Sequence, residues 1–256
     1  MSGDRVPIAL ASFVALLSLW LPRQAIPAEA IIAVASNFLE TAEQLAVRFE
    51  RQSAHELTLT AGSTGKLYAQ ITQGAPFAAL LAADQERPRR LEQAGLAVKR
   101  TRFTYARGRL ALWSADETRI VRDATALSTG RFSALAIANP DLAPYGVAAR
   151  EALQRLGIWD SVESRIVFGE NIAQTFTFVA TKNAELGLVA LSQVLSARIR
   201  NAGSRWDVPV TLYDPIRQDA LLLKHGADNA AARAFLEYLQ TSAAREMIRA
   251  AGYMTD

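Results

Sequence analysis

The sequence predicts an α/β protein, and three observations support this fold class. The chain of 256 residues is 50% hydrophobic, which is enough to bury one large core or two modest ones. Short apolar runs that are typical of buried strands alternate with stretches whose apolar residues recur at helical spacing. Small polar residues occupy several turns between a strand and the next helix. Such alternation is typical of parallel strands joined by crossover helices.

The first half of the chain alternates strands with helices. The expected strands are short apolar runs bounded by polar residues, at 31–35, 57–60 and 77–82. The expected helices cover 38–49, 66–73 and a stretch that ends at Gly95. The turns that join them lie at the carboxyl ends of the strands, where open α/β sheets bind their ligands.

The second half begins with a longer strand over 103–114. Arg107-Gly108-Arg109 interrupts this strand, so it could cross from one lobe to another. Further strands are expected at 134–138 and 186–191, and strand-like runs at 208–213 and 220–223. Helices are expected at 145–156, 172–180, 230–239 and 243–252. For Arg107 and Arg109 we favour salt bridges over an effect on the potential of a cleft.

Residues 1–30 resemble a signal peptide. Arg5 precedes an apolar run over 8–21, and Ala28-Glu29-Ala30 fits the small-x-small pattern of a cleavage site. The run of about 14 residues is short against the roughly 20 that a membrane-spanning helix needs, which disfavours the alternative of a retained anchor. We therefore expect an exported protein whose mature chain begins near Ile31, after cleavage near Ala30.

Composition and motifs argue against several classes of function. The chain has no cysteine, two histidines and a net charge of +3, from 28 basic and 25 acidic residues. The basic residues are scattered, whereas nucleic-acid binders gather them on one face, so nucleic acid is not an expected partner. Gly62-Ser63-Thr64-Gly65-Lys66 lacks the first glycine of a phosphate-binding loop, and Leu67 stands where that loop has serine or threonine.

The enzyme alternatives find little support in the sequence. A hydrolase nucleophile elbow needs Gly-x-Ser-x-Gly, which is absent. His55 and His225 are expected at the surface, and neither lies near Ser36 or Ser63 in sequence. Acidic residues that could serve as acid and base are expected to be solvated: Asp84, Glu86 and Asp141. We therefore expect a binding protein and no catalytic residues.

The turns before four helices are rich in groups that could bind an anion. A helix start leaves backbone N–H groups without partners and carries the positive end of the helix dipole. Each turn taken alone is more simply a cap or a tight turn, so a site forms only if the fold brings them together. The candidate donors are Ser36, Asn37, Ser63, Thr64, Tyr145 and Ile172.

These residues lie in segments that resemble the periplasmic molybdate-binding proteins of ABC importers. The resemblance covers essentially all of 31–256 and includes Asn139-Pro140-Asp141, Pro144-Tyr145-Gly146 and the two turns with Ser36 and Ser63. It implies a type II periplasmic-binding-protein fold, in which two lobes each hold a mixed, mostly parallel sheet flanked by helices. Lobe one would cover 31–108 plus 214–256, lobe two 109–213, with the ligand in the cleft between them.

By resemblance, the anion is held by hydroxyl and backbone N–H donors. Ser36 and Asn37 would donate at the first turn, Ser63 at the second with Thr64 as the adjacent choice, and Ile172 through its backbone. Many members of the family have a tyrosine where Ala190 stands here. In a second subgroup the tyrosine lies at the position of Tyr145, so the phenol is relocated and the number of donors is kept.

The implied function is capture of molybdate or tungstate and delivery to an ABC permease. The metal would be bound as its oxyanion, with no cofactor and no direct metal ligand from the protein. A dianion stripped of water needs a donor for each oxygen, and neutral donors suffice. None of the candidate residues is acidic, which argues against a protonated ligand. Sulfate or another oxyanion is the first alternative, a secreted hydrolase the second, and we expect a monomer.

Overall fold

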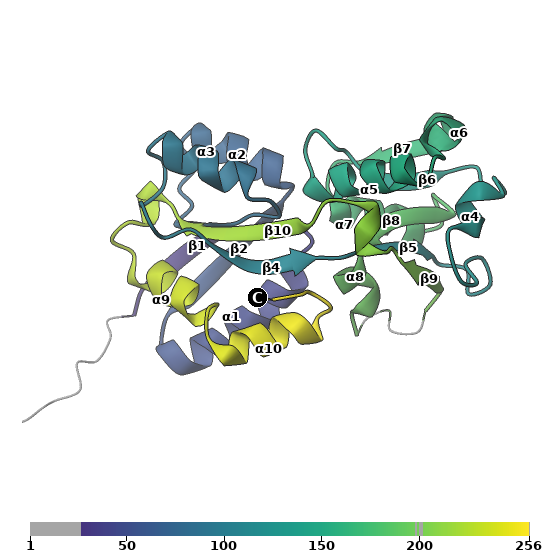
Figure 1. Ribbon diagram of the computed structural model, residues 1–256. Helices are drawn as coiled ribbons and strands as arrows, with labels where there is room; N and C mark the ends of the chain where they lie inside the picture. The colour runs from purple at the N-terminus through teal and green to yellow at the C-terminus, as the bar shows by residue number, and fades with distance from the viewer. Residues whose placement is uncertain (1–26, 198, 200–201, 256) are drawn as a thin grey trace, which may run out of the picture.

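The computed structural model, which describes residues 27–197, 199 and 202–255, has two α/β lobes side by side (Figure 1). Each lobe contains one five-stranded sheet with helices on both faces. Most of the expected leader, residues 1–26, lies outside the described residues. Within the described ranges, none of the helices combines the length and the apolar character that crossing a membrane requires.

Lobe one is built on the sheet β2-β1-β3-β10-β4. Strands β1, β2 and β3 are parallel, and β10 runs antiparallel to both β3 and β4. The strands are β1 (Glu29–Ala35), β2 (Glu56–Gly62), β3 (Ala79–Leu81), β4 (Phe103–Gly108) and β10 (Ile216–Leu222). The helices are α1 (Leu39–Ser53), α2 (Thr64–Thr72), α3 (Glu86–Gln93), α9 (Ala230–Tyr238) and α10 (Ser242–Ala250).

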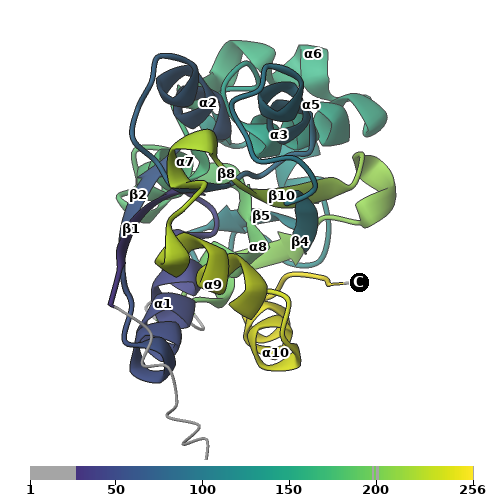
Figure 2. The ribbon, with the colours of Figure 1, turned by 90° about the vertical axis from the view of Figure 1, so that its left-hand side faces the viewer.

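The two faces of this sheet bury separate apolar clusters, because successive side chains of a strand point to opposite faces. Ile32 and Val34 of β1 pack in a cluster with residues of α1, α9 and α10. Ala33, between them, packs in another cluster with residues of α2 and α3. Figure 2 shows α2 and α3 on one side of the sheet and α1, α9 and α10 on the other.

Lobe two is built on the sheet β7-β6-β8-β5-β9. Strand β6 is parallel to β7 and β8, and β5 runs antiparallel to β8 and β9. The strands are β5 (Leu110–Ser114), β6 (Leu135–Ala138), β7 (Ile166–Gly169), β8 (Leu186–Ala190) and β9 (Ser204–Asp207). The helices are α4 (Thr125–Ser128), α5 (Pro144–Arg155), α6 (Trp159–Val162), α7 (Ile172–Ala180) and α8 (Leu191–Leu195).

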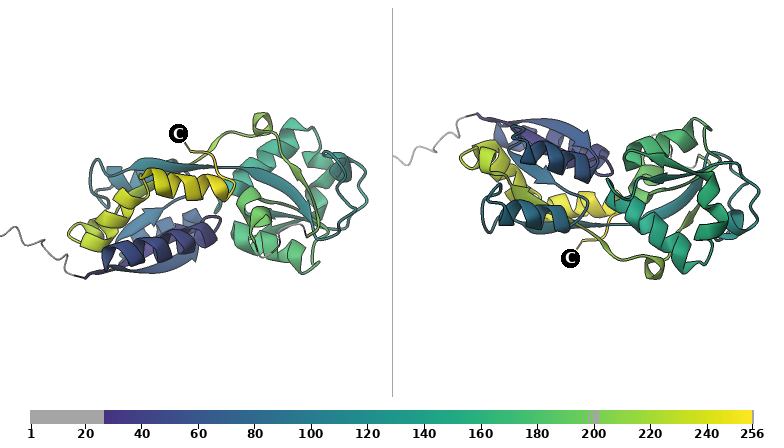
Figure 3. Two further views of the ribbon diagram at one scale, coloured as in Figure 1. Left: turned by 90° about the horizontal axis from the view of Figure 1, so that it is seen from below. Right: turned by 90° about the horizontal axis from the view of Figure 1, so that it is seen from above.

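The chain passes between the lobes at two places. Strand β4 ends at Gly108 and β5 begins at Leu110, so the long strand expected over 103–114 is two strands in two sheets. The return connection runs from β9 to β10 and is visible in both views of Figure 3. In each sheet one strand, β10 or β5, runs against the others, so the sheets are mixed and mostly parallel, as predicted.

Several local expectations are wrong. Residues 208–213 were expected to form a strand but contain a 3₁₀ turn, Val210–Leu212, between Pro209 and Pro215. Proline lacks the N–H that a strand ladder needs, which explains this difference. Strand β10 begins earlier than its apolar run, because Gln218 and Asp219 are buried polar residues of the strand.

The expected cleavage site after Ala30 lies inside strand β1, which begins at Glu29. Glu29 and Ala30 pair with Glu56 and Leu57 of β2, and Ala30 is buried. Cleavage after Ala30 would therefore remove two paired residues of the strand. His55, expected at the surface, is buried, and its Nδ1 accepts a hydrogen bond from the N–H of Ala28 (3.3 Å). His225 is exposed.

Candidate functional site

The candidate donors occupy the carboxyl ends of four strands, two in each lobe. In lobe one, Ser36 follows β1 and Ser63 follows β2, and the N–H of Ser36 donates to the carbonyl of Gly62 (2.9 Å). The register pairs Ala35 with Gly62, so the two turns lie side by side. In lobe two, Tyr145 lies in the helix after β6 and Ile172 in the helix after β7, and β6 and β7 are also neighbours.

The first turn differs from its expected role as a helix cap. Helix α1 begins at Leu39 with Phe38 at the N-cap and no side-chain cap bond, so Ser36 lies too far upstream to cap it. Ser36 is partly exposed and Asn37 is buried. The Nδ2 atom of Asn37 donates to Oε1 of Gln218 (3.0 Å) and to the hydroxyl of Tyr253 (3.3 Å). The Asn37 side chain is thus part of a buried network.

The second turn uses both of its hydroxyls inside the fold. Ser63 is the N-cap of α2, and its Oγ accepts from the N–H of Lys66 (3.4 Å). The Oγ1 atom of Thr64 accepts from the N–H of Ala83 (3.0 Å), just beyond the end of β3. Both residues are buried. Thr64 therefore ties α2 to β3. Both hydroxyls accept in these bonds, so each still has its own hydrogen to donate.

In lobe two, Tyr145 brings a phenol to the boundary between the lobes. It follows Pro144, the first residue of α5, and is 1% exposed. Burial raises the pKa of Tyr145 well above 10, so the hydroxyl keeps its proton. Its oxygen accepts from Nε2 of Gln218 on β10 (3.4 Å). The phenol approaches Gly108 so closely that a Cβ there would lie 2.2 Å from the hydroxyl oxygen.

The fourth turn presents the start of helix α7. Asn171 caps this helix, and its Oδ1 accepts from the N–H groups of Ala173 (2.9 Å) and Gln174 (3.0 Å). The N–H of Ile172, the first residue of the helix, is outside this cap. Gln193 fixes the same turn, because its amide bonds both the carbonyl of Ile172 and the N–H of Ala190 (3.1 Å each).

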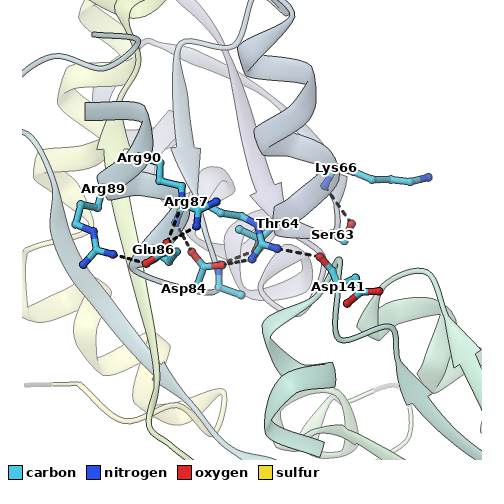
Figure 4. A network of polar contacts seen from close by, with 10 residues as sticks. Ser63, Thr64, Lys66, Asp84, Glu86, Arg87, Arg89, Arg90 and Asp141 are labelled. Carbon is cyan, nitrogen blue, oxygen red and sulfur yellow. Dashed lines mark hydrogen bonds and ion pairs between the residues drawn. The ribbon is translucent and has the colours of Figure 1, made fainter. Parts of the chain in front are cut away.

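Contacts between the lobes bring these turns to face one another. The N–H of Gly65 donates to the carbonyl of Leu142 (2.9 Å). Arg87 pairs with Asp84 (2.6 Å) and also reaches the carbonyl of Asp141 in the other lobe (3.1 Å), as Figure 4 shows. Lys66, three residues after Ser63, forms an ion pair with Glu170, two residues before Ile172. This exposed ion pair joins the first turn of α2 to the residue that precedes the N-cap of α7.

The candidate donors are uncharged, and the charged side chains of Lys66 and Glu170 lie near them. None of the six candidate residues carries a charge, and the nearby charges of Lys66 and Glu170 are paired with each other at the surface. A groove of about 650 Å³ is lined by Ser36 and Asn37 of lobe one and by residues of α7 and α8. The other four candidates are buried and do not belong to its lining.

In the described part of the chain, the metal-ligating side chains form no cluster of three, and an arginine at the crossing between the lobes has an acidic partner. Among the described residues, no three histidine, aspartate or glutamate side chains come together as a metal site would require. Arg109 forms an ion pair with Asp207 (3.5 Å), the role favoured for it from the sequence.

Sequence reasoning missed the residues that surround the candidate donors. Gln218 and Tyr105 come from β10 and β4, and Tyr253 and Ser192 come from near the carboxyl terminus and from α8. They bond one another, Asn37 and Tyr145. One feature of the sequence could have indicated buried polar residues here. The polar pair Gln218-Asp219 lies directly before an apolar run that predicts a buried strand.

Two α/β lobes with hydrogen-bond donors gathered where they meet define an extracellular solute-binding protein. The chain belongs to the bacterial extracellular solute-binding protein family, whose model matches residues 30–254. It is 46% identical over 228 residues to the molybdate-binding protein ModA of Rhodobacter capsulatus, covering 89% of each chain. It is 47% identical over 226 residues to ModA of Azotobacter vinelandii, covering 88% of this chain and 90% of that one.

The solved structures agree with this assignment. The periplasmic molybdate-binding protein of Azotobacter vinelandii superposes with a TM-score of 0.86 at 38% identity, covering 89% of this chain and 99% of that one. The predicted type II binding-protein fold is therefore confirmed.

Proposed function

We propose that this protein captures molybdate or tungstate in the periplasm and delivers the anion to an ABC permease. The observation that carries the proposal is the convergence of uncharged donors from both lobes at the ends of β1, β2, β6 and β7. Molybdate and tungstate are dianions without protons, so each oxygen can accept but cannot donate. A site of neutral donors matches that chemistry, and charge-assisted bonds offset the cost of removing water. The relatives named as molybdate-binding support the choice of ligand.

Each candidate donor has a proposed role that fits its contacts. The hydroxyls of Ser36, Ser63 and Tyr145 would donate to the anion, as would the backbone N–H groups of Asn37 and Ile172. The side chain of Asn37 is held by Gln218 and Tyr253, which favours its backbone for this role. Thr64 would act by holding α2 against β3. The metal would have no direct protein ligand, since the oxygens of the anion lie between.

Closure of the two lobes around the anion would complete the site. We propose that the lobes are 31–108 with 214–256, and 109–213, which places the boundaries at the crossings from β4 to β5 and from β9 to β10. Opening would separate the donors of Ser36 and Ser63 from those of Tyr145 and Ile172 and would admit water. Export would require cleavage of the leader, and a monomer would suffice, since both lobes come from one chain.

The proposal is tested by titration of the purified mature protein with molybdate, tungstate, sulfate and phosphate in a calorimeter. We expect molybdate and tungstate to bind tightly with a stoichiometry of one, and sulfate to bind much more weakly because it is smaller than the cavity for the larger anions. Equal affinity for sulfate would instead assign the protein to the alternative ligand. The absence of binding to any oxyanion would leave the hydrolase alternative, and hydrolysis of ester substrates would then be measured.

A further inference from the structure

A buried side chain that the proposed site does not include lies between two of its donors. Gln218, on β10, is 0% exposed, and its amide contacts Asn37, Tyr105 and Tyr145. The inference drawn from it rests on the proposed function, because it concerns how Tyr145 is presented to an oxyanion. The question is whether the Tyr145 hydroxyl acts as donor or acceptor, and the network around Gln218 answers it.

The direction of the hydrogen bonds follows from one atom that can only accept, the carbonyl oxygen of Asn37. The Tyr253 hydroxyl lies 2.6 Å from this carbonyl and must donate to it. Because a hydroxyl has one hydrogen, the Tyr253 oxygen can then only accept from its other partners. Ser192 donates to it from 2.9 Å, and the Asn37 side-chain atom that faces it at 3.3 Å must be the nitrogen Nδ2.

The orientation of Asn37 in turn determines that of Gln218. Nδ2 of Asn37 also faces the Gln218 amide at 3.0 Å, so the atom there must be the acceptor Oε1. The Tyr105 hydroxyl lies 3.0 Å from the same oxygen and 3.1 Å from the carbonyl of Ala82, so its one hydrogen is shared between these two acceptors. The nitrogen Nε2 of Gln218 is therefore directed at Tyr145 (3.4 Å), and the Tyr145 oxygen accepts. The hydroxyl hydrogen of Tyr145 is left to point elsewhere.

Two further features keep this arrangement rigid. Gly108 lies against both groups: a Cβ at this position would be 2.2 Å from the Tyr145 oxygen and 2.6 Å from Nε2 of Gln218. Tyr145, Gln218 and Asn37 are each at most 5% exposed, so no bulk water replaces the amide donor. Gly108 is the last residue of β4, where the chain leaves lobe one, and Gln218 and Asn37 belong to lobe one.

We propose that Gln218 is a positioning residue that makes Tyr145 a hydrogen-bond donor toward the cleft and thereby favours fully deprotonated oxyanions. A ligand such as hydrogen phosphate must place its own O–H against an acceptor. The Tyr145 oxygen already accepts from Gln218, and the remaining proposed donors are hydroxyls and backbone N–H groups that face an anion. Selectivity against protonated anions thus arises from the polarity of the network as well as from the size of the cavity.

The experiment compares two substitutions at Gln218 with a matched control. Gln218→Met keeps the approximate shape and removes the amide, and Gln218→Glu offers Tyr145 an acceptor that draws its hydrogen away from the ligand. Gln85→Met is the control, because Gln85 bonds Thr104 and Asp219 in the same lobe, outside the proposed site. Calorimetry measures molybdate, sulfate and phosphate binding at mildly alkaline pH, where sulfate and hydrogen phosphate have similar size and charge but differ by one proton.

We expect Gln218→Glu to lower molybdate affinity by about a hundredfold or more, since a donor is lost and a negative charge is added. Gln218→Met should lower it by about tenfold and should reduce the preference for sulfate over phosphate by a similar factor. In the Tyr145→Phe background, Gln218→Met should have little further effect, because the group it positions is gone. Gln85→Met should leave all three affinities unchanged.

Other results would overturn the inference and leave the proposed function standing. Suppose that the wild type binds molybdate but Gln218→Met weakens the binding of sulfate and of phosphate by the same factor. Gln218 would then have only a structural role. The same conclusion would follow if the loss of molybdate affinity in Gln218→Met added in full to that in Tyr145→Phe. If Gln218→Met does not fold, Gly108→Ala tests the same contact from the other side. It should displace the phenol and weaken molybdate about tenfold, and unchanged affinity would contradict the inference. A wild type that binds no oxyanion would instead refute the proposed function.

Discussion

The two lobes share one strand order and differ in how they present donors to the site. In each sheet the first position is taken by β2 or β7 and the second by the strand that precedes it in the chain, β1 or β6. The fourth position is taken by an antiparallel strand, β10 or β5. The candidate donors follow the equivalent strands β1 and β2 in lobe one, and β6 and β7 in lobe two. The fold therefore decides where the donors lie, and the local sequence decides which chemical group is presented.

The difference is clearest at the helices α2 and α7, which follow the equivalent strands β2 and β7. In lobe one, Ser63 caps α2 with the same hydroxyl that is proposed to face the anion. In lobe two, these tasks are divided: Asn171 caps α7, and Ile172 presents only its backbone. A side chain that serves two purposes is sensitive to substitution in two ways, whereas a backbone donor tolerates change in its own side chain.

Among the proposed donors themselves, the largest expected effect is that of removing the phenol of lobe two. Tyr145→Phe should reduce molybdate affinity by about ten- to hundredfold, or roughly 1.5–3 kcal/mol, because one charge-assisted hydrogen bond is lost. The fold should be retained, since the ring and its packing remain. Calorimetry with Tyr238→Phe as the control, a tyrosine of α9 outside the site, measures the difference. Equal affinity of Tyr145→Phe and the wild type would show that the hydroxyl is not a ligand.

The second prediction compares the two helix caps. Ser63→Ala should lower both molybdate affinity, by about tenfold, and the free energy of unfolding, by about 1 kcal/mol, because donor and cap are lost together. Asn171→Ala should cost about 1 kcal/mol of stability and change affinity by only a few fold, since the N–H of Ile172 remains.

The readout for this pair is calorimetry combined with urea unfolding of the ligand-free protein. The comparison of the lobes holds if the two variants lose similar stability but differ in affinity. A loss of affinity in Asn171→Ala as large as that in Ser63→Ala would mean that caps and ligands are not separated in lobe two.

Sequence reasoning reached the fold and the turns but not the network behind them. The alternation of apolar runs and helical periods, together with small polar residues before α2 and α7, is local information, so residues such as Ser63 and Ile172 could be singled out. Gln218 could not, because its partners Asn37 and Tyr145 are 181 and 73 residues away. Hydrogen bonds over such separations form because β10 lies between β3 and β4 in the sheet, and no local sequence pattern specifies that position. The 3₁₀ turn after Pro209 was missed for a related reason, since Val, Thr and Tyr favour a strand by composition alone.

The smallest predicted effect concerns acid stability, in which the lobes also differ. In lobe one the residue before β3 is Ala78, whose N–H bonds the backbone carbonyl of Ile31 (2.8 Å). In lobe two the residue before β8 is Glu185, whose carboxylate accepts from the hydroxyl of Ser133 (2.7 Å) and from the N–H of Ala134 (3.0 Å). The Ser133 hydroxyl bond, followed by the N–H bonds, lowers the pKa of Glu185 to about 2.

Because this pKa is lower in the folded than in the unfolded protein, the stabilisation is complete above the unfolded pKa, near 4.5, and is lost as the pH falls toward 2. Glu185→Gln should therefore lower the free energy of unfolding at neutral pH by about 1–2 kcal/mol, a value that is reduced because the carboxylate is partly exposed. The free energy of unfolding should also fall less steeply in this variant between these two pH values. Urea unfolding at several pH values, with Glu246→Gln in α10 as an exposed control, measures both. An acid decline as steep in Glu185→Gln as in the wild type would assign the acid sensitivity to other carboxylates and remove this difference between the lobes.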